Sequence, residues 1–398
     1  MNRQLFFPAC ACNALLCVSL QAGAADQSFD PRLEVGGSYD SNLRLAYPPL
    51  DDKVNGGYVD AAAIWSAQTP LTDFSLQPRV RATRYSGNGE SGTTNAYLTG
   101  NLAHKLRRGR LGLAVDLSKQ EVLTADLLRA NGGGGLGTPG TDTAGLAFNN
   151  NKALFATVQP TGNFGLGART QLLVDTRYTH VNYDPALAQT LNDYTDVAGS
   201  VGLSFQATQR VRWVTNLTAD RFTPESGTRD ASSLGANVEL WREQSQLTRA
   251  FVRLGAVRTQ FSGSGSPSET NFNGGLGIQR KFTDGLVFLQ ANRRVDASGF
   301  GQAVVRDELN LRLGRNLSER VLVSASTVGI WTKPVATSST LSKRRYYVAS
   351  LGGEWRIRRT ASIVARLQYA SRNNENQAGT PNSTAAYAGV VFEPHRRN

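Results

Sequence analysis

Strict alternation between apolar and polar residues constrains this chain more than any other feature of its sequence. In the run 111–117, leucine or valine occupies every odd position, whereas Gly112, Ala114 and Asp116 occupy the even positions. The run 197–206 repeats the pattern, with Val197, Val201, Leu203 and Phe205 in one phase and mostly small or polar residues in the other. A period of two over a run of this length predicts a β-strand with one apolar and one polar face. A helical period is nearly absent.

The alternation recurs between positions 31 and 392 in eighteen runs, each bounded by turn residues. The predicted strands are 32–45, 57–68, 73–85, 95–106, 111–121, 152–160, 166–182, 194–206, 211–222, 231–242, 247–261, 270–281, 286–295, 304–315, 319–331, 344–356, 361–371 and 383–392.

The connections between these runs alternate in length. Tight turns at 69–71, 107–110, 207–210, 243–246 and 282–285 are interleaved with longer connections such as 46–56, 122–151 and 183–193. Short turns at one end and long loops at the other are typical of outer-membrane barrels. We therefore expect an all-β, transmembrane, antiparallel up-and-down β-barrel of about 18 strands, with 16 to 18 compatible with the pattern. It would form one domain over 25–398, with short periplasmic turns and long extracellular loops.

A water-soluble sandwich or propeller also contains many short alternating strands. Such a fold would have to bury every apolar face in a protein core, and the opposite faces carry Arg, Asp, Asn and Gln, which a dry core does not hold unpaired. No repeat of propeller length with a recurrent signature is found in the sequence. Both points favour the membrane barrel.

The N-terminus predicts a cleaved signal peptide over 1–24. Arg3 provides a positive charge, a mostly apolar run follows, and Ala22-Gly23-Ala24 matches an A-x-A cleavage site. All three cysteines, Cys10, Cys12 and Cys17, lie inside this segment. The exported chain would therefore lack disulfides, thiolate metal sites and cysteine nucleophiles.

Aromatic residues gather near the ends of the predicted strands, as the interfacial girdles of a barrel require. We expect this role for Trp65, Tyr85, Tyr178, Phe205, Trp213, Trp241, Trp331, Tyr347, Trp355, Tyr369 and Phe392. Tyr97 and Phe251 fall instead in the polar phase of their strands, where they could stack against carbohydrate.

The polar faces of the strands carry more basic than acidic residues, in keeping with 43 Lys and Arg against 31 Asp and Glu in the whole chain. The arginines expected to line the lumen and contact the transported solute are Arg79, Arg81, Arg177, Arg212, Arg253, Arg294, Arg312 and Arg366. The inward acids are expected at Asp116, Asp175, Asp220, Glu239, Glu308 and Glu354. Guanidinium groups on a low-dielectric wall attract and grip anions. The alternative is that these arginines pair with acids on neighbouring strands.

The longest connection, 122–151, is the third of the long loops. It contains Gly132–Gly135 and a Pro139-Gly140 pair, which no regular element tolerates, together with Asp126, Arg129 and Asp142. In some porins the third loop folds into the lumen and narrows it. We expect either a constriction loop containing these three charged residues or a loop that stays outside the barrel.

Two motifs resemble known outer-membrane proteins. The segment Gly36-Gly37-Ser38-Tyr39-Asp40-Ser41-Asn42-Leu43, together with basic turns such as Arg358-Arg359, resembles a family of outer-membrane β-barrel porins associated with exopolysaccharide gene clusters. Tyr387-Ala388-Gly389 leading to Phe392 resembles the terminal signal of barrels, although Glu393 and Pro394 follow it. The resemblance implies passage of a polysaccharide across the outer membrane, insertion by the barrel assembly machinery and a periplasmic polysaccharide copolymerase as partner. It implies no catalytic residue.

These observations predict an outer-membrane pore for an exopolysaccharide, surrounded by outer-membrane lipid and lipopolysaccharide. The alternatives are a general or anion-selective diffusion porin and a lipid-modifying enzyme or scaffold. Catalysis is not expected, because of the three histidines His104, His180 and His395 only His180 is expected near the outer leaflet, and no serine is expected to face outward at its depth. We expect no cofactor, no metal and no nucleic-acid partner, since the basic turns do not form one contiguous face.

Overall fold

The computed structural model describes residues 25–43, 45, 53–86, 92–121, 152–184, 191–225, 229–262, 268–335, 342–375 and 379–394. The predicted signal peptide lies outside the described residues. The described chain forms eighteen strands: β1 (Asp26–Asp40), β2 (Val54–Gln68), β3 (Thr72–Ser86), β4 (Thr93–Leu106), β5 (Gly109–Glu121), β6 (Lys152–Gly165), β7 (Thr170–Tyr183), β8 (Tyr194–Thr208), β9 (Val211–Pro224), β10 (Ala231–Ser245), β11 (Thr248–Phe261), β12 (Ser268–Phe282), β13 (Gly285–Ala297), β14 (Ala303–Asn316), β15 (Val321–Pro334), β16 (Arg344–Arg358), β17 (Ala361–Asn374) and β18 (Asn382–Phe392).

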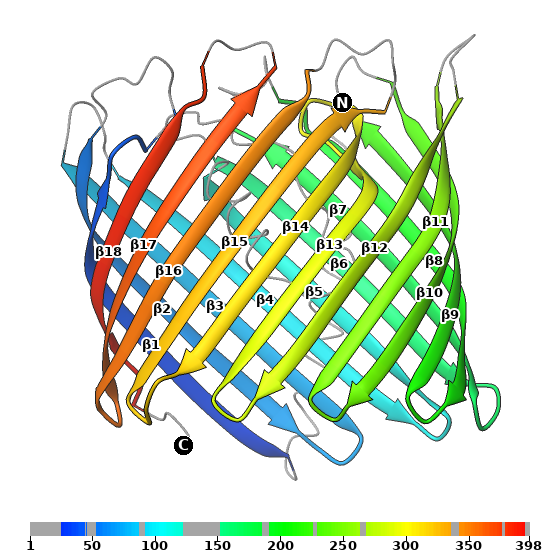
Figure 1. Cartoon of the computed structure of the whole chain (residues 1–398), viewed down its shortest axis with the longest axis horizontal. Helices are drawn as coiled ribbons and strands as arrows, with labels where there is room; N and C mark the ends of the chain where they lie inside the picture. Colours follow the sequence, from blue (N-terminus) through cyan, green and yellow to red (C-terminus); the bar gives the residue numbers. More distant parts are fainter. Residues whose placement is uncertain are drawn as a thin grey trace, which may run out of the picture.

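Each strand pairs antiparallel with its neighbours in sequence, and β1 pairs with β18. The result is a closed barrel with steeply tilted strands and tight turns at its lower end (Figure 1). The predicted architecture and all eighteen strands are therefore confirmed. The boundaries differ in places: β7 begins at Thr170 rather than at 166, because Leu166 and Gly167 both donate backbone hydrogen bonds to the carbonyl of Thr170 in a turn.

The seam between β1 and β18 is short, and side chains reinforce its upper end. The two strands pair only from Leu33 to Asp40, whereas β1 pairs with β2 over its full length. The Asp40 carboxylate accepts hydrogen bonds from Ser383 Oγ of β18 (2.5 Å) and from the backbone N–H of Asn42 (2.9 Å). The Asn42 amide donates to the Asn382 carbonyl (3.1 Å). The Tyr-Asp-Ser-Asn segment noted in the sequence thus helps to close the barrel.

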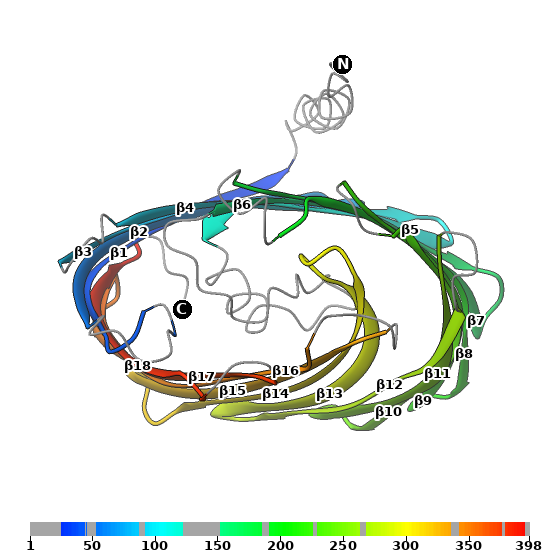
Figure 2. The ribbon, with the colours of Figure 1, turned by 90° about the horizontal axis from the view of Figure 1, so that it is seen from above.

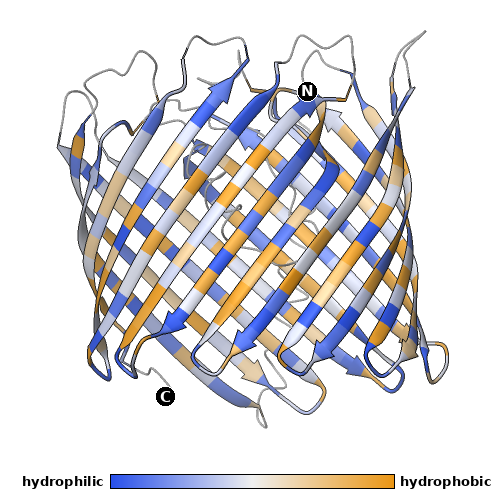
Figure 3. Ribbon diagram, viewed as in Figure 1, coloured by the Kyte–Doolittle hydropathy of each residue, from blue (hydrophilic) through white to orange (hydrophobic). Residues whose placement is uncertain are grey.

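The exterior of the barrel is apolar. Hydrophobic and hydrophilic residues alternate along the strands in the foreground of Figure 3, and the exposed aliphatic side chains include Leu217 (63%), Leu234 (68%) and Leu254 (59%). Water-soluble proteins rarely expose contiguous apolar patches of more than a few hundred Å². A surface of this kind around a whole barrel is stable in hydrocarbon, where each strand has its backbone groups satisfied by its neighbours. Separately, the described residues contain no helix that is long and apolar enough to cross a membrane.

The buried apolar side chains lie inside the barrel, near its upper end. One cluster joins the upper ends of β6 to β10 to the β13–β14 connection, and a second joins β15, β16 and β17 to Leu45 of the β1–β2 connection. The inner wall is otherwise polar, so these apolar side chains can be buried only where another chain segment packs on them inside the barrel. In the two clusters those segments are the β13–β14 connection and Leu45. The site described next lies below these clusters.

Candidate functional site

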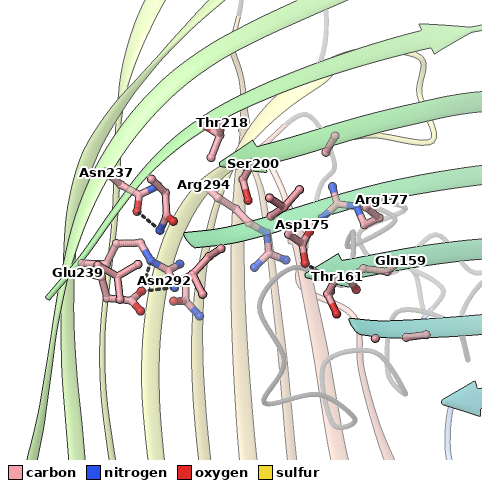
Figure 4. A pocket seen from close by; sticks show the side chains of 18 of the residues that line it. Gln159, Thr161, Asp175, Arg177, Ser200, Thr218, Asn237, Glu239, Asn292 and Arg294 are labelled. Carbon is pink, nitrogen blue, oxygen red and sulfur yellow. Dashed lines mark hydrogen bonds and ion pairs between the residues drawn. The ribbon is translucent and has the colours of Figure 1, made fainter. Parts of the chain in front are cut away.

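The lumen contains a cavity of about 1050 Å³, lined by the polar faces of β3 to β14. Figure 4 shows side chains from several strands converging on it, among them Asp175 and Arg177 of β7, Glu239 of β10 and Arg294 of β13. Asp175 accepts a hydrogen bond from the amide of Gln159 on the neighbouring β6 (2.8 Å). These residues belong to the polar phase of the alternation, so the face assignment made from sequence holds here.

The eight arginines predicted to line the lumen all lie on lumenal faces, and five of them form ion pairs. Arg79 of β3 makes a bidentate contact with Asp60 of β2, with Nε and Nη2 at 2.9 and 2.5 Å from the two carboxylate oxygens. Arg81 lies 3.9 Å from the same carboxylate. Asp60 is buried and lies near the middle of β2. One acid therefore neutralises part of the charge of two mid-barrel arginines.

The same pairing recurs on the other side of the barrel. Arg177 of β7 contacts Asp196 of β8 at 3.0 Å, and Arg253 of β11 contacts Glu239 of β10 at 2.5 Å. Both acids are almost fully buried. Such pairs fix the side chains in place, and their fields are strong because the wall excludes water.

Arg294 of β13 is the centre of a larger ion-pair network. It lies 3.2 Å from Asp296 on its own strand and 3.5 Å from Glu308 on β14. Glu308 also contacts Arg306, which is buried, at 3.3 Å. Asp296 in turn interacts electrostatically with Arg177, so this network spans from β13 and β14 to β7.

Three of the predicted arginines make no ion pair within the described part of the chain. The Arg212 guanidinium of β9 lies over the Trp241 ring, 5.4 Å from its centroid. Arg312 donates to the Asn310 amide oxygen (3.3 Å) and lies 5.8 Å from the Phe288 centroid. Arg366 is exposed on the lumenal face of β17, directly opposite Tyr387 of β18. Cationic side chains without a carboxylate partner are available to an anionic solute.

The lumenal acids that the sequence did not predict include Glu34, Asp60, Asp73, Asp196 and Asp296. Asp60 is followed by Ala61–Ala63, whose side chains are too small to show which phase of the strand is polar. Three of these acids, Asp60, Asp196 and Asp296, are partners of predicted arginines. The predicted excess of arginine on the wall is therefore smaller in the structure, and the alternative reading, pairing across neighbouring strands, holds for most of the set.

The connection between β13 and β14 bends into the barrel and narrows it. Seen from above, the yellow end of this hairpin leaves the wall and crosses the interior (Figure 2). Its carbonyl at Gly299 accepts a hydrogen bond from the backbone N–H of Asn192, which lies before β8 (2.7 Å). The centroid of its Phe300 ring lies 3.8 Å from Cζ of Arg344 on β16, in a cation–π contact. Residues 297–303 are thus held from two sides of the lumen.

The chain also turns inward after β1, where Leu45 enters the lumen. Leu45 is 2% exposed and packs on Ile330 and Tyr346 in the upper lumen, and its carbonyl accepts a hydrogen bond from Arg372 (3.0 Å). Leu45 adopts a positive φ of 47°, which a leucine rarely takes. The burial of its side chain against Ile330 and Tyr346 offsets the conformational free energy that this φ costs.

The third connection, 122–151, was expected either to form a constriction or to stay outside the barrel. With Asp126, Arg129 and Asp142, it lies outside the described residues. The narrowing that the structure describes comes from the β13–β14 hairpin and from Leu45, and neither was predicted from the sequence to narrow the lumen.

Two aromatic assignments were wrong. Trp241 and Tyr85 lie in the lumenal phase of β10 and β3, together with Glu239 and Arg81 respectively, and so they are not girdle residues. Trp213, Trp355 and Tyr369 are exposed on the outer face as expected. Tyr97 and Phe251 face the lumen, where Arg79 and Arg253 lie 5.6 and 5.8 Å from their ring centroids.

Two of the three histidines lie among the described residues, and each has a threonine as partner. His180 accepts or donates one hydrogen bond with Thr195 (3.3 Å), and His104 does so with Thr72 (2.9 Å). His395 lies outside the described residues. Among the residues that the structure covers, no group of three or more His, Cys, Asp or Glu side chains is arranged to hold a metal ion.

No family model matches the sequence, and no curated protein matches it either. Among solved structures the chain is similar to the outer membrane protein OpdK from Pseudomonas aeruginosa, with a TM-score of 0.46, 10% identity, and coverage of 92% of this chain and 99% of that one. It is also similar to OprD from the same organism, with a TM-score of 0.42, 10% identity, and coverage of 93% of this chain and 96% of that one. The FrpB iron transporter from Neisseria meningitidis is a third similar structure, with a TM-score of 0.45, 10% identity, and coverage of 94% of this chain and 82% of that one. The proposed function therefore rests on the lumen of this chain.

Proposed function

We propose that the protein is an outer-membrane channel through which an anionic exopolysaccharide passes. The observation that carries the proposal is a closed barrel whose exterior is apolar and whose lumen is lined by charged side chains fixed in ion pairs, with further guanidinium groups left over. An aqueous lumen of this chemistry suits a hydrated solute that carries negative charge.

The location in the outer membrane rests on the barrel itself and on the predicted signal peptide. Up-and-down barrels with short turns at one end are the spanning architecture of that membrane. The same orientation places the tight turns and the end of β18 in the periplasm, and the connections after β1, β7 and β13 outside the cell.

A polymer is favoured over a small solute because charged side chains recur at several places on the lumenal wall. Ion pairs join β2 to β3, β7 to β8 and β10 to β11, so groups of both charges are present at each of these places. A chain of sugars can exchange one set of contacts for the next as it moves. An anion-selective diffusion porin is the second candidate, because Arg212 and Arg366 would attract small anions equally well.

Reconstitution into planar bilayers tests the channel. We expect ion conductance with a reversal potential in a KCl gradient that shows preference for chloride. Absence of conductance, both in the exported chain and after deletion of residues 124–148, would contradict every transport function and favour a scaffold.

Polymer passage is tested in the bacterium that carries the gene. Deletion of the gene is expected to leave polysaccharide in the periplasm and to reduce it at the surface. Unchanged surface polysaccharide, combined with anion-selective conductance, would support the diffusion porin instead.

A further inference from the structure

A row of aromatic and cationic side chains crosses the lower lumen. Arg212 of β9 pairs directly with Trp241 of β10, Trp241 with Phe251 of β11, and Phe251 with Gly277 of β12. Neighbouring strands are about 4.8 Å apart, so the row extends over about 14 Å of wall. We call these four residues the aromatic row. All four line the cavity described above.

The two rings of the row form one aromatic pair. Their centroids are 4.9 Å apart and their planes are tilted by 32°, so the rings are in contact and partly overlap. The edge of the Phe251 ring lies against the opposite position, which is Gly277: a Cβ there would overlap the ring at Cε1. At Gly275, two residues earlier on the same face, a Cβ would lie 3.6 Å from the ring. The glycines therefore leave room for the ring beside the wall, and both rings of the pair are partly exposed.

Charged groups fix this surface in place. The indole N–H of Trp241 donates to Glu239 Oε1, and the other oxygen of Glu239 accepts from Arg253 Nε at 2.6 Å. Glu239 is 3% exposed, so both of its oxygens are already engaged below the surface of the wall. Its charge is compensated by Arg253 and therefore repels an incoming anion only weakly.

Arg212 supplies the remaining positive charge. It lies over the Trp241 ring at the periplasmic end of β9 and makes no ion pair within the described part of the chain. A guanidinium group binds a carboxylate with two parallel hydrogen bonds. The row thus combines an apolar platform with one anion-binding group beside it.

We propose that the aromatic row is a subsite for a pyranose that carries a carboxylate, that is, a uronic acid unit. The C–H face of the sugar ring packs against the exposed part of the Trp241–Phe251 pair, and the carboxylate binds Arg212. The next position in the same register is Gln290 of β13, which also lines the cavity and whose amide can bind a sugar hydroxyl. Because Arg212 is near the start of its strand and Gln290 is near the middle of its own, this path rises from the periplasmic mouth toward the upper lumen. The inference rests on the proposed channel function and names the class of polymer.

Trigalacturonate is the probe, added on the periplasmic side of a planar bilayer that contains the full exported chain. We expect it to block the current at lower concentration than the neutral maltotriose. Replacement of Arg212 by Gln should weaken the block by trigalacturonate roughly tenfold and leave that by maltotriose unchanged, because only the charged contact is lost. Trp241→Leu should weaken both. Trp213→Leu, which changes an outward-facing tryptophan in the next position of β9, is the matched control and should change neither.

A second readout does not depend on an open pore. Trp241 is the only one of the five tryptophans whose side chain lines the cavity, and all five lie in the described strands. Trigalacturonate should therefore change the tryptophan fluorescence of the protein in detergent, and this change should disappear in Trp241→Phe.

The outcomes separate the two proposals. A conducting channel that trigalacturonate neither blocks nor perturbs in fluorescence would overturn the subsite and leave the channel function in place. Equal block by succinate would show that Arg212 binds anions without the rings, which also overturns it. Absence of conductance with a fluorescence response that Trp241→Phe removes would support the subsite and contradict the channel.

Discussion

At the scale of single residues, glycines decide where large lumenal side chains fit. Tyr58 of β2 lies across Gly36 of β1 and Gly389 of β18, and its hydroxyl donates to Glu34 (2.8 Å). A Cβ at Gly36 would lie 2.8 Å from Tyr58 Cζ and 2.8 Å from the Cα of Gly389, and would overlap the Ala388 carbonyl. The ring can therefore bridge the seam only where the wall beneath it has no side chain.

Replacing Gly36 with Ala is expected to destabilise the barrel by about 1–3 kcal/mol, because the methyl group meets backbone atoms that cannot move aside. The matched control is Gly37→Ala, where the nearest atom to a new Cβ is 3.7 Å away and the side chain points outward. Unfolding by guanidinium in detergent, followed by tryptophan fluorescence, measures both variants. Equal stability of the two would show that the seam relaxes more easily than its packing indicates.

At the scale of the strand, alternation assigns each position to lipid or to lumen. Leu217 and Thr218 are consecutive residues of β9: Leu217 is 63% exposed on the outer face, and Thr218 points into the cavity (Figure 4). A shift of the register by one residue would exchange these environments along the whole strand.

An arginine at position 217 is expected to cost about 2–4 kcal/mol in a lipid bilayer, the value typical of the midplane of a barrel. At position 218 the same side chain reaches water and the carboxylates of the wall, so its effect should be small. Unfolding free energies in liposomes compare Leu217→Arg with Thr218→Arg. A larger cost for Thr218→Arg would mean that the two faces of β9 are assigned the wrong way round.

The β13–β14 hairpin is the element that departs most from the regular pattern. Val304 and Val305 are 1% exposed, and Arg306 is buried beside them, although all three lie at the upper end of β14, opposite the tight turns. Such burial requires the hairpin to leave the wall and pack against the opposite side. The apolar ends of β6 to β10 provide the surface that receives it.

Shortening the hairpin should widen the pore. Replacement of residues 297–303 by Asn-Gly joins Asp296 to its register partner Val304 through a two-residue turn that suits a hairpin. Single-channel conductance should rise, because the removed residues cross the lumen. Phe300→Ala keeps the hairpin backbone and should raise it less. Unchanged conductance in the shortened variant would place the narrowest point elsewhere.

At the scale of the whole molecule, the ion selectivity reflects the sum of the lumenal charges. Five of the eight predicted lumenal arginines are partly neutralised by acids, namely by Asp60, Asp196, Glu239, Asp296 and Glu308. The three arginines without an ion pair in the described chain are a minority of the eight. We nevertheless expect them to contribute most of the preference for anions, because no carboxylate offsets their charge.

The double variant Arg212→Gln and Arg366→Gln should lower the preference for chloride, whereas Asp60→Asn should raise it because Arg79 and Arg81 lose their carboxylate. Reversal potentials in a KCl gradient at low ionic strength measure both changes, since salt screens these charges. Opposite signs of the two shifts are the expected result. Shifts of the same sign would contradict the lumenal placement of one of these groups.

The sequence alone determined the number of strands, their alternating direction and the face on which each predicted arginine lies. A period of two is a local property, and every strand meets the same two environments, so neighbouring residues are enough to show it. Only the tertiary structure decided that Asp60 faces Arg79, that Trp241 joins Phe251 in the lumen, and that residues 297–303 pack inside the barrel. Those outcomes depend on the register between strands and on contacts between segments far apart in the chain, and an alternating pattern carries no information about either.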